Sequence, residues 1–381
     1  MATTFKTLTA EDISNTRTYL NESIPITSSI VSGTYIDTGV ENNIYRYSHG
    51  MFETVFDYPY ASSSANNLFD ITLGHNSSAP TFNSSTTTQN SKKANIYSQM
   101  SKILSGVDTT GSILSFDEDG VVSANNDYKI NTAFFLNFSR LLVKDEIKKG
   151  SFRMSYATVA SASSPTKANL FATTGTISDV SGATTYFTNS PAGEYGILYQ
   201  TDANANIQTT QTNRAVGLIY YQAGVVVLNS NIFAASGTSA ITTDLDTNQR
   251  GQLGTKATMF YSTGAYTDIT DLFTNATIEA SADALRRRIG DISFQNVTEL
   301  NSSIYFIKVN NSEFNYSSNP TYLSSSQIYV KNGVSNNAAF SYITTVGLYS
   351  ADNALLAVAK LSEPIKKSQD QSLMLRVRLD Y

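Results

Sequence analysis

The stretch SYITTVGLYSADNALLAVAKLSEPI, residues 341–365, predicts a β-hairpin. Two apolar runs, Tyr342–Tyr349 and Ala354–Leu361, flank the turn-forming segment Ser350–Asn353. Apolar runs of this length joined by a few turn residues are typical of paired antiparallel strands. We therefore expect this stretch to form two neighbouring strands of an antiparallel β fold.

The alternation in SLMLRVRLDY, residues 372–381, predicts one further strand. Arg376 and Arg378 fall on one face of such a strand, together with Met374. The opposite, core-facing side carries Leu373, Leu375, Val377 and Leu379. The sequence stops flush with this strand, and two explanations are open. Either the backbone at Tyr381 is held in a sheet that fits against other subunits, or the domain simply ends with its last core strand.

Residues 91–106, SKKANIYSQMSKILSG, predict the clearest helix. Ser91 is a suitable N-cap, and Gly106 is a natural stop. A single apolar stripe at helical spacing consists of Ile96, Met100, Ile103 and Leu104, with Tyr97 beside it. Two other stretches are ambiguous. Residues 8–22 suit a short helix or turn capped by Thr9 and Asp12, and residues 281–290 suit a short helix or a polar arm.

Most of the remaining chain predicts strands and polar loops. Residues 132–142 are strongly apolar and favour a buried strand, and Gln222–Gly224 separates two apolar runs that predict a hairpin. Stretches of small polar residues predict loops: residues 75–90 an exposed loop, and residues 157–190 either loops alone or loops with short strands. Helices do not alternate with strands as a parallel sheet requires. We therefore expect a mainly β fold, a multi-layer antiparallel β-sandwich with a few short helices and long polar loops.

The same pattern suggests three consecutive parts. Residues 1–155 form the first part of the β core, with a helical excursion near 91–106. Residues 156–290 are rich in loops and suit an insertion. Residues 291–381 supply the strands that complete the core.

The composition narrows the classes of function. Of 381 residues, 41% are apolar and only 15% are charged, with a net charge of −5. A neutral polar surface repels other copies weakly, which suits crowded assemblies. The negative net charge argues against non-specific binding of nucleic acid, and no apolar run reaches the roughly 18 residues of a membrane span. We therefore expect neither nucleic acid nor membrane among the partners.

Few residues suggest catalysis or a cofactor. The chain has no cysteine, which excludes disulfides and thiolate sites and suits assembly in a reducing cytoplasm. A histidine-based site would need one of the two histidines; we expect His49 to pack among its aromatic neighbours and His75 to lie at the surface. Asp117–Gly120 lacks the spacing of a calcium loop and favours a charged turn. We expect no catalytic, cofactor-binding or metal-binding residue.

Two stretches and the last strand are candidates for an assembly interface. Residues 44–60 are the most aromatic part of the chain, and Tyr suits interfaces because its ring buries area while its hydroxyl stays in water. The arginine triplet in LRRRI, residues 285–289, favours a solvated surface over an anchor for an acidic partner. The candidate interface residues are Tyr45, Tyr47, Phe52, Tyr58, Arg286, Arg287, Arg288, Arg376, Arg378 and Tyr381.

Three stretches resemble virion structural proteins of contractile-tailed bacteriophages, notably marine and cyanobacterial ones. They are NIYRYSHGMFETVFDYPYASSSANNLFDITLG, then KKANIYSQMSKIL with FFLNFSRLLVKDEIKKGSF, and finally YITTVGLYSADNALLAVAKLSEPIKKSQDQSLMLRVRLDY. The last is similar to the C-terminal part of baseplate wedge proteins. The resemblance covers residues 1–155 and 335–381 and is loose between them.

This resemblance implies a layered β-sandwich with helical insertions, and a scaffold role without enzymatic activity. It also implies contacts with other baseplate and tail proteins, self-association within the particle, and a place in the tail baseplate of the virion after assembly in the host cytoplasm. Two other functions are open. A receptor-binding or fibre-attachment protein of the virion would contact glycans through Tyr-rich surfaces. A carbohydrate-active enzyme would need two dispersed carboxylates, although the chain has no Trp to line a sugar groove.

Overall fold

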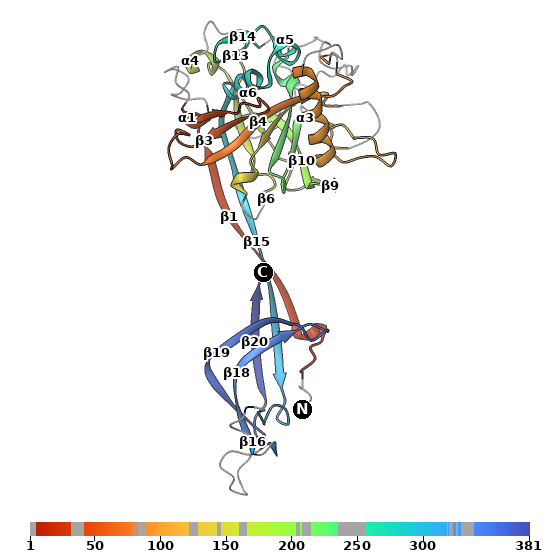
Figure 1. Ribbon diagram of the computed structural model, residues 1–381, viewed down its shortest axis with the longest axis vertical. Helices are drawn as coiled ribbons and strands as arrows, with labels where there is room; N and C mark the ends of the chain where they lie inside the picture. Colours follow the sequence, from red (N-terminus) through yellow and green to blue (C-terminus); the bar gives the residue numbers. More distant parts are fainter. Residues whose placement is uncertain are drawn as a thin grey trace. The chain divides into compact units, whose positions relative to one another are not determined.

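The structure, a computed structural model, shows a mainly β chain with antiparallel sheets and few short helices (Figure 1). The predicted fold class is therefore confirmed. The structure describes residues 5–31, 42–79, 81–82, 88–121, 129–142, 146–159, 166–202, 206–207, 215–234, 257–317, 319, 323–324, 327–328 and 339–381.

The chain forms two compact units. The smaller unit consists of residues 1–20 and 299–381, and the larger unit consists of residues 21–298. The strands β1 (Ile13–Ile26) and β15 (Ile289–Val309) have residues in both units. These limits differ from the three consecutive parts expected from the sequence, because segments from both ends of the chain combine in the smaller unit.

The larger unit is built on one antiparallel sheet, with the strand order β15-β7-β8-β10-β11-β12-β5-β4-β3-β2; β6 pairs with β15 and β9 with β10. Its strands are β2 (Ile44–Arg46), β3 (Glu53–Phe56), β4 (Asn67–His75), β5 (Thr132–Asn137), β6 (Glu146–Ile147), β7 (Arg153–Ala157), β8 (Thr174–Ser178), β9 (Phe187–Ser190), β10 (Gly193–Thr201), β11 (Ala215–Tyr220) and β12 (Val225–Asn229), with a separate pair β13 (Met259–Tyr261) and β14 (Gly264–Tyr266). Its helices are α1 (Ser28–Val31), α3 (Thr88–Leu104), α4 (Lys167–Leu170), α5 (Ile269–Asn275) and α6 (Ile278–Arg286), with the 3-10 turns η2 (Ser139–Leu141) and η3 (Ser230–Phe233).

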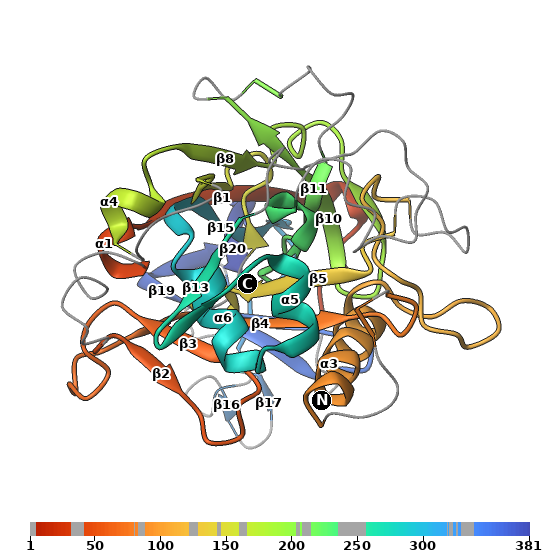
Figure 2. The ribbon, with the colours of Figure 1, turned by 90° about the horizontal axis from the view of Figure 1, so that it is seen from above.

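The core of the larger unit lies along β11, β12 and β5, which are buried over nearly their whole length. Val227 of β12 pairs with Leu218 of β11 and with Phe135 of β5. Figure 2 shows α3, α5 and α6 grouped over the β4–β5 part of the sheet, and continuous apolar runs are typical of strands that are covered on both faces. The buried strand predicted within residues 132–142 and the hairpin predicted around residues 222–224 are both confirmed.

Helix α3 begins at residue 88, three residues before the predicted cap Ser91. It packs against β4, where Gly74 is required because a Cβ there would come within 2.7 Å of the helix backbone. The predicted apolar stripe is confirmed at Ile96 and Leu104, which are buried together with Tyr97 beside them, but Ile103 is 59% exposed. The buried face of α3 is therefore narrower than the apolar pattern suggests.

The predicted short helix near the N-terminus is a single 3-10 turn, η1 (Ala10–Asp12). The expected capping box is present: the Thr9 N–H donates to Asp12 Oδ2 at 2.9 Å. The helix ends there because β1 begins at Ile13, so the prediction of helix or turn over residues 8–22 is wrong beyond this point. Residues 14–23 of β1 are all exposed.

His75 is buried, so its predicted position at the surface is wrong. It is the last residue of β4, with Nδ1 3.2 Å from the Thr81 hydroxyl and Nε2 3.3 Å from the carbonyl oxygen of Asn90. Burial lowers the pKa of His75 to about 4, and the nearby charge of Lys93 acts in the same direction. The imidazole is therefore neutral in the folded protein at neutral pH.

The smaller unit contains a two-layer β-sandwich. One layer pairs β15 with β20 (Leu373–Asp380), and the other is the hairpin of β18 (Phe340–Tyr349) and β19 (Leu355–Ser368). The facing side chains form a core of Ile307, Val309 and Leu375, surrounded by half-buried apolar residues of all four strands. The unit also contains η1 and the short pair β16 (Leu323–Ser324) and β17 (Gln327–Ile328).

The two sequence predictions for this region are confirmed. Leu348 pairs with Ala357 in the hairpin, which matches the two predicted apolar runs. In β20, Leu375 is buried while Met374 and Arg376 are exposed, which matches the predicted alternation.

We expect acid to destabilise the protein through His75. Its pKa is about 4 in the folded protein against an ordinary 6.5, so the unfolded chain binds more protons between these values and stability falls as the pH drops through this window. Asp117 and Asp179, whose pKa values burial raises to about 6, act in the opposite direction. Urea unfolding of the wild type and of His75→Gln, measured from about pH 7 to pH 4, isolates the effect of His75. Over this range the free energy of unfolding of the wild type should fall by about 2–3 kcal/mol more than that of the variant. A difference that does not change with pH would contradict this assignment.

Candidate functional site

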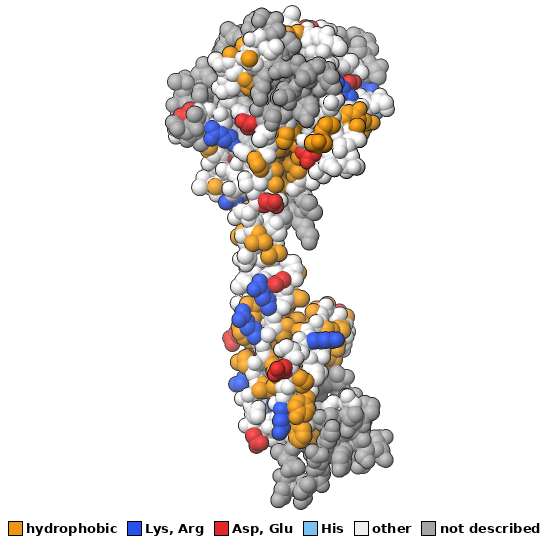
Figure 3. Space-filling view, turned by 90° about the vertical axis from the view of Figure 1, so that its left-hand side faces the viewer, with side chains coloured by type: hydrophobic (Ala, Val, Ile, Leu, Met, Phe, Trp, Pro, Cys, Tyr) orange, Lys and Arg blue, Asp and Glu red, His pale blue; other side chains and the backbone are white. Residues whose placement is uncertain are grey.

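Exposed apolar side chains are concentrated in the smaller unit. Of the 21 large apolar side chains exposed among the described residues, 13 belong to this unit, although the larger unit holds most of the chain. Figure 3 shows one face of it, with apolar side chains in orange among charged side chains of both signs, Lys and Arg in blue and Asp and Glu in red. Its buried apolar residues are only Ile307, Val309, Ala339 and Leu375 among those described. Large exposed apolar patches are typical of surfaces that a partner covers.

One such surface, the hairpin face, is the outer side of the β18–β19 hairpin. Gly347 pairs with Val358 and Tyr349 pairs with Leu355, so these residues share one side of the hairpin. The Tyr349 ring and Leu355 lie over Gly347, which has no side chain to displace them, and Phe5 packs edge-on against Tyr349 with ring centroids 5.0 Å apart. The hairpin face consists of Phe5, Tyr349, Leu355, Leu356 and Val358, which are between 44% and 68% exposed.

A second surface, the basic face, is the outer side of the β15–β20 pair. Phe306 lies opposite Arg376, and Lys308 lies opposite Met374. All four side chains are exposed, so apolar area and positive charge alternate across the two strands. The basic face consists of Phe306, Lys308, Met374, Arg376 and Arg378, and it includes two of the predicted interface residues.

The backbone of Tyr381, another predicted interface residue, is hydrogen-bonded within the sheet, whereas its ring is exposed to solvent. Its N–H donates to the carbonyl oxygen of Asn301 at 2.9 Å, and its own carbonyl oxygen accepts from the Asn301 N–H at 3.2 Å. The side chain is 70% exposed. The backbone at this position is therefore held in the sheet, which is compatible with both explanations considered for the last strand.

Three of the four predicted aromatic residues come together in the larger unit. Tyr47 contacts Tyr45 and Phe52, with ring centroids 4.6 and 4.7 Å apart. His49 stacks on Tyr47 at 5.1 Å, so it packs among aromatic rings as expected. Tyr58 is 56% exposed. This cluster is a third, smaller surface, with Tyr45 and His49 exposed.

The arginine triplet is buried in the larger unit, so its predicted position on a solvated surface is wrong. Helix α6 begins after Thr277, whose hydroxyl accepts the Ala280 N–H at 3.1 Å, and it ends at Arg286. The Arg286 Nε donates to Glu53 of β3 at 2.7 Å, and both side chains are fully buried. Buried arginines with internal partners are not available to another protein.

Asp283 is the second acid of this cluster. Its carboxylate pairs with Arg286, with Arg287 at 3.2 Å and with Arg46 of β2 at 3.1 Å. Burial alone would raise the pKa of Asp283, but the three guanidinium groups lower it below its ordinary value. Arg288 instead donates to two backbone carbonyl oxygens, at 3.0 and 2.7 Å. The cluster therefore joins α6 to β2 and β3 and has a structural role.

Sequence reasoning missed the hairpin face and the acidic partners of the arginines. Leu355–Val358 is a run of four apolar residues, whereas a strand with one buried side needs only every second residue to be apolar. This excess was the available signal for the hairpin face. Glu53 and Arg286 are 233 residues apart, and no local pattern indicates that they pair.

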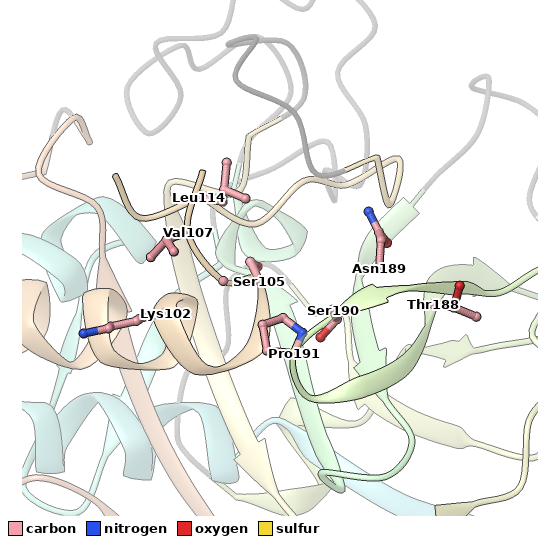
Figure 4. A pocket seen from close by; sticks show the side chains of 9 residues that line it. Lys102, Ser105, Val107, Leu114, Thr188, Asn189, Ser190 and Pro191 are labelled. Carbon is pink, nitrogen blue, oxygen red and sulfur yellow. The ribbon is translucent and has the colours of Figure 1, made fainter. Parts of the chain in front are cut away.

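A surface pocket of about 550 Å³ lies at the C-terminal end of α3 (Figure 4). Among the described residues that line it, Lys102 is the only titratable one, so they provide no acid–base pair. Its lining residues are Lys102, Ser105, Gly106, Val107, Leu114, Thr188, Asn189, Ser190 and Pro191.

Within the part of the chain that the structure describes, no three His, Asp or Glu side chains gather closely enough to hold a metal ion. None of the described helices is long and apolar enough to span a membrane. No protein-family model, curated protein or solved structure matches this chain. The function is therefore inferred from the two faces of the smaller unit.

Removing Glu53 should destabilise the larger unit strongly, because Arg286 stays buried with one anion fewer. Removal of one partner of a buried ion pair lowers the free energy of unfolding by about 3–5 kcal/mol. Arg17→Ala is the matched control, since it removes an ion pair with Glu299 in which the side chains are 65% and 39% exposed, and it should cost less than about 1 kcal/mol. Urea unfolding of Glu53→Ala and Arg17→Ala measures both losses, and equal losses would contradict the structural role of the cluster.

Proposed function

We propose that the chain is a structural component of a contractile phage tail, a baseplate wedge subunit whose smaller unit docks onto neighbouring proteins. The observation that carries this proposal is the exposed apolar surface of the smaller unit, divided between the hairpin face and the basic face. Shape and contact surfaces, rather than catalysis, are what such a subunit contributes.

Covering these faces would stabilise an assembly substantially. Full burial of one Leu or Val side chain is worth about 1.5–3 kcal/mol. Leu355, Leu356 and Val358 are each more than half exposed, so a partner that covers the hairpin face gains several kcal/mol from these three alone. Contiguous exposed apolar area of this kind is often functional in a soluble protein.

The proposed assignment to a contractile tail rests on the sequence resemblance. The stretch that is similar to wedge proteins, residues 342–381, forms nearly all of β18, β19 and β20. The resemblance and the exposed surface thus fall on the same segment of the chain. The proposal includes contacts with other baseplate and tail proteins, and a place in the virion after assembly in the host cytoplasm.

A receptor-binding protein of the virion is the second candidate, favoured by the aromatic cluster of the larger unit. Tyr45 and Tyr60 lie with ring centroids 5.1 Å apart and are 36% and 45% exposed. Open aromatic rings suit stacking on sugar rings. This candidate requires the isolated protein to bind host cells, with loss of binding in Tyr60→Ala, and a clean absence of binding would exclude it.

Purified particles, with tails separated from heads, provide the direct test. Quantitative mass spectrometry should find the chain in tails at a multiple of six copies per particle, as expected of a closed ring with the symmetry of a contractile baseplate. Enrichment with heads would contradict the baseplate assignment, and absence from the particle would contradict the structural role altogether.

A variant pair tests the docking role of the smaller unit. Leu356→Asp should reduce incorporation into tails severely, because it places a charge in the middle of the hairpin face. Ile103→Asp is the control, since Ile103 has a similar exposed fraction, 59% against 68%, but lies on α3 of the larger unit. Equal incorporation of the two variants, both with unchanged melting temperatures, would contradict docking through this face.

A further inference from the structure

We infer that Lys129 and Asp117 become joined covalently in the folded chain, through an amide bond between Lys129 Nζ and Asp117 Cγ. This bond is a modification within one chain, and it forms whichever protein the smaller unit contacts. Three features of the Asp117–Gly120 turn favour it: a buried contact between lysine and aspartate, a buried carboxylate oxygen without a donor, and a second carboxyl group beside the first.

The two side chains face each other across a single β-bridge of the larger unit. Asp117 and Lys129 form an isolated antiparallel bridge, and next to it the Ile130 N–H donates to the Phe116 carbonyl oxygen at 3.0 Å. Side chains directly opposite each other in such a pair lie on the same side. Lys129 Nζ lies 2.8 Å from Asp117 Oδ2, and both side chains are more than nine-tenths buried. The lysine nitrogen is therefore held close to the carboxyl carbon and away from bulk water.

The Asp117 carboxylate is poorly stabilised for a buried anion. Its Oδ1 is buried and accepts no hydrogen bond from the residues that the structure describes. Burial raises the pKa of Asp117 to about 6; the Asp119 carboxyl group acts in the same direction, and the Lys129 ammonium in the opposite one. A buried charge costs free energy unless it is paired and fully hydrogen-bonded. The neutral pair, a carboxylic acid beside an amine, is therefore easier to reach here than in water.

The turn fixes Asp119 beside this pair. The Gly120 N–H donates to the Asp117 carbonyl oxygen at 3.2 Å, and the Val121 N–H donates to Asp119 Oδ1 at 2.8 Å. Gly120 has a φ of 76°, which favours glycine, and its carbonyl oxygen accepts from the Tyr195 hydroxyl at 2.9 Å. The Asp119 carboxyl group lies within hydrogen-bonding reach of that of Asp117. Two carboxyl groups at this range hold one shared proton more readily than two charges, so Asp119 is placed to carry a proton.

The reaction balances without a co-reactant. Lys129 first gives a proton to the two carboxyl groups, which leaves a neutral amine beside a neutral carboxylic acid. The amine nitrogen then attacks Asp117 Cγ, and the Nζ–Cγ bond forms. Asp119 takes a proton from the attacking nitrogen and delivers it to the Asp117 hydroxyl, which leaves as water when its bond to Cγ breaks. One amine and one carboxylic acid are consumed, and one amide and one water are produced.

A bound cation is the other occupant that a turn rich in carboxylates suggests. The described residues include no group of three His, Asp or Glu side chains that could hold a metal ion. The Lys129 ammonium already lies against Asp117 Oδ2 and would repel a second cation. A metal ion would add a buried charge, whereas condensation removes two. The arrangement therefore favours the amide bond.

The intact mass of the full wild-type chain, measured under denaturing conditions, tests this inference. It should be lower than the mass calculated from the sequence by the mass of one water molecule. Trypsin cuts after lysine and arginine, and Lys129 is the only such residue between Lys102 and Arg140. A linked Lys129 resists trypsin, so residues 103–140 should be released as one peptide that lacks one water.

A second buried lysine serves as the internal control in the same digest. Lys93 is fully buried, but its Nζ donates to the backbone carbonyl oxygens of Leu272 and Phe273 rather than to a carboxylate. It has no carboxyl group to condense with at this contact. Trypsin should therefore cut after Lys93 in the denatured chain.

Two variants locate the chemistry. Lys129→Arg keeps a positive charge opposite Asp117 but has no amine to acylate, so it should have its full calculated mass. Asp119→Ser keeps a side-chain oxygen for the Val121 N–H but removes the second carboxyl group, so most of this variant should stay unlinked. Circular dichroism melting curves should show that both variants are folded, with a lower melting temperature than the linked wild type.

A wild-type chain with its full calculated mass and ordinary cleavage after Lys129 would overturn the inference. So would a loss of water that persists in Lys129→Arg, because it would arise from cyclisation at the Asp119–Gly120 peptide bond instead. Complete linkage in Asp119→Ser would overturn the role of Asp119 as proton carrier. None of these results changes the proposed place in a contractile tail, which the analysis of purified particles tests separately.

Discussion

Among its described residues, the smaller unit buries few apolar side chains, and its exposed surface is best understood from this small core. Ile307, Val309 and Leu375 are its large buried apolar residues among those described. Part of its interior is polar: the ammonium group of Lys367 is fully buried and donates to three oxygen atoms, including Asn315 Oδ1 at 2.8 Å. Small domains bury a low fraction of their surface and are correspondingly marginal. A partner that covers the hairpin face or the basic face adds the missing burial.

The larger unit is built differently. Its central strands are buried along their length, and the pairing of Arg286 with Glu53 joins α6 to β3 inside the unit. A buried ion pair contributes little net stability compared with an apolar pair, but removing one partner is costly, so it fixes which elements meet. The larger unit thus has its own buried core and buried ion pairs. The described residues of the smaller unit include few buried apolar side chains and two faces with exposed apolar side chains. This difference supports a docking role for the smaller unit.

Much of the fold could be predicted because it is encoded locally. The period of two in residues 373–379 and the two apolar runs around residues 350–353 each lie within one element, and both are confirmed. The failures depend on distant contacts. The sequence around Arg286 predicts a solvated side chain, because its partner Glu53 lies far away in the sequence. His75 looks like the start of a loop, but residues after it fold back to bury it. The hairpin face was missed because a continuous apolar run is equally compatible with a strand that is buried on both sides, and the sequence does not show that one side stays exposed.

Hydroxyl-radical footprinting of the chain in purified tails and in isolation tests the central claim most directly. If the smaller unit is the docking unit, Tyr349, Leu356 and Met374 should be labelled several-fold less in the particle than in the isolated chain. Ile103, on the exposed side of α3, should be labelled equally in both states. Equal labelling of the smaller unit in the two states would show that its apolar faces stay open to water, and would contradict the claim.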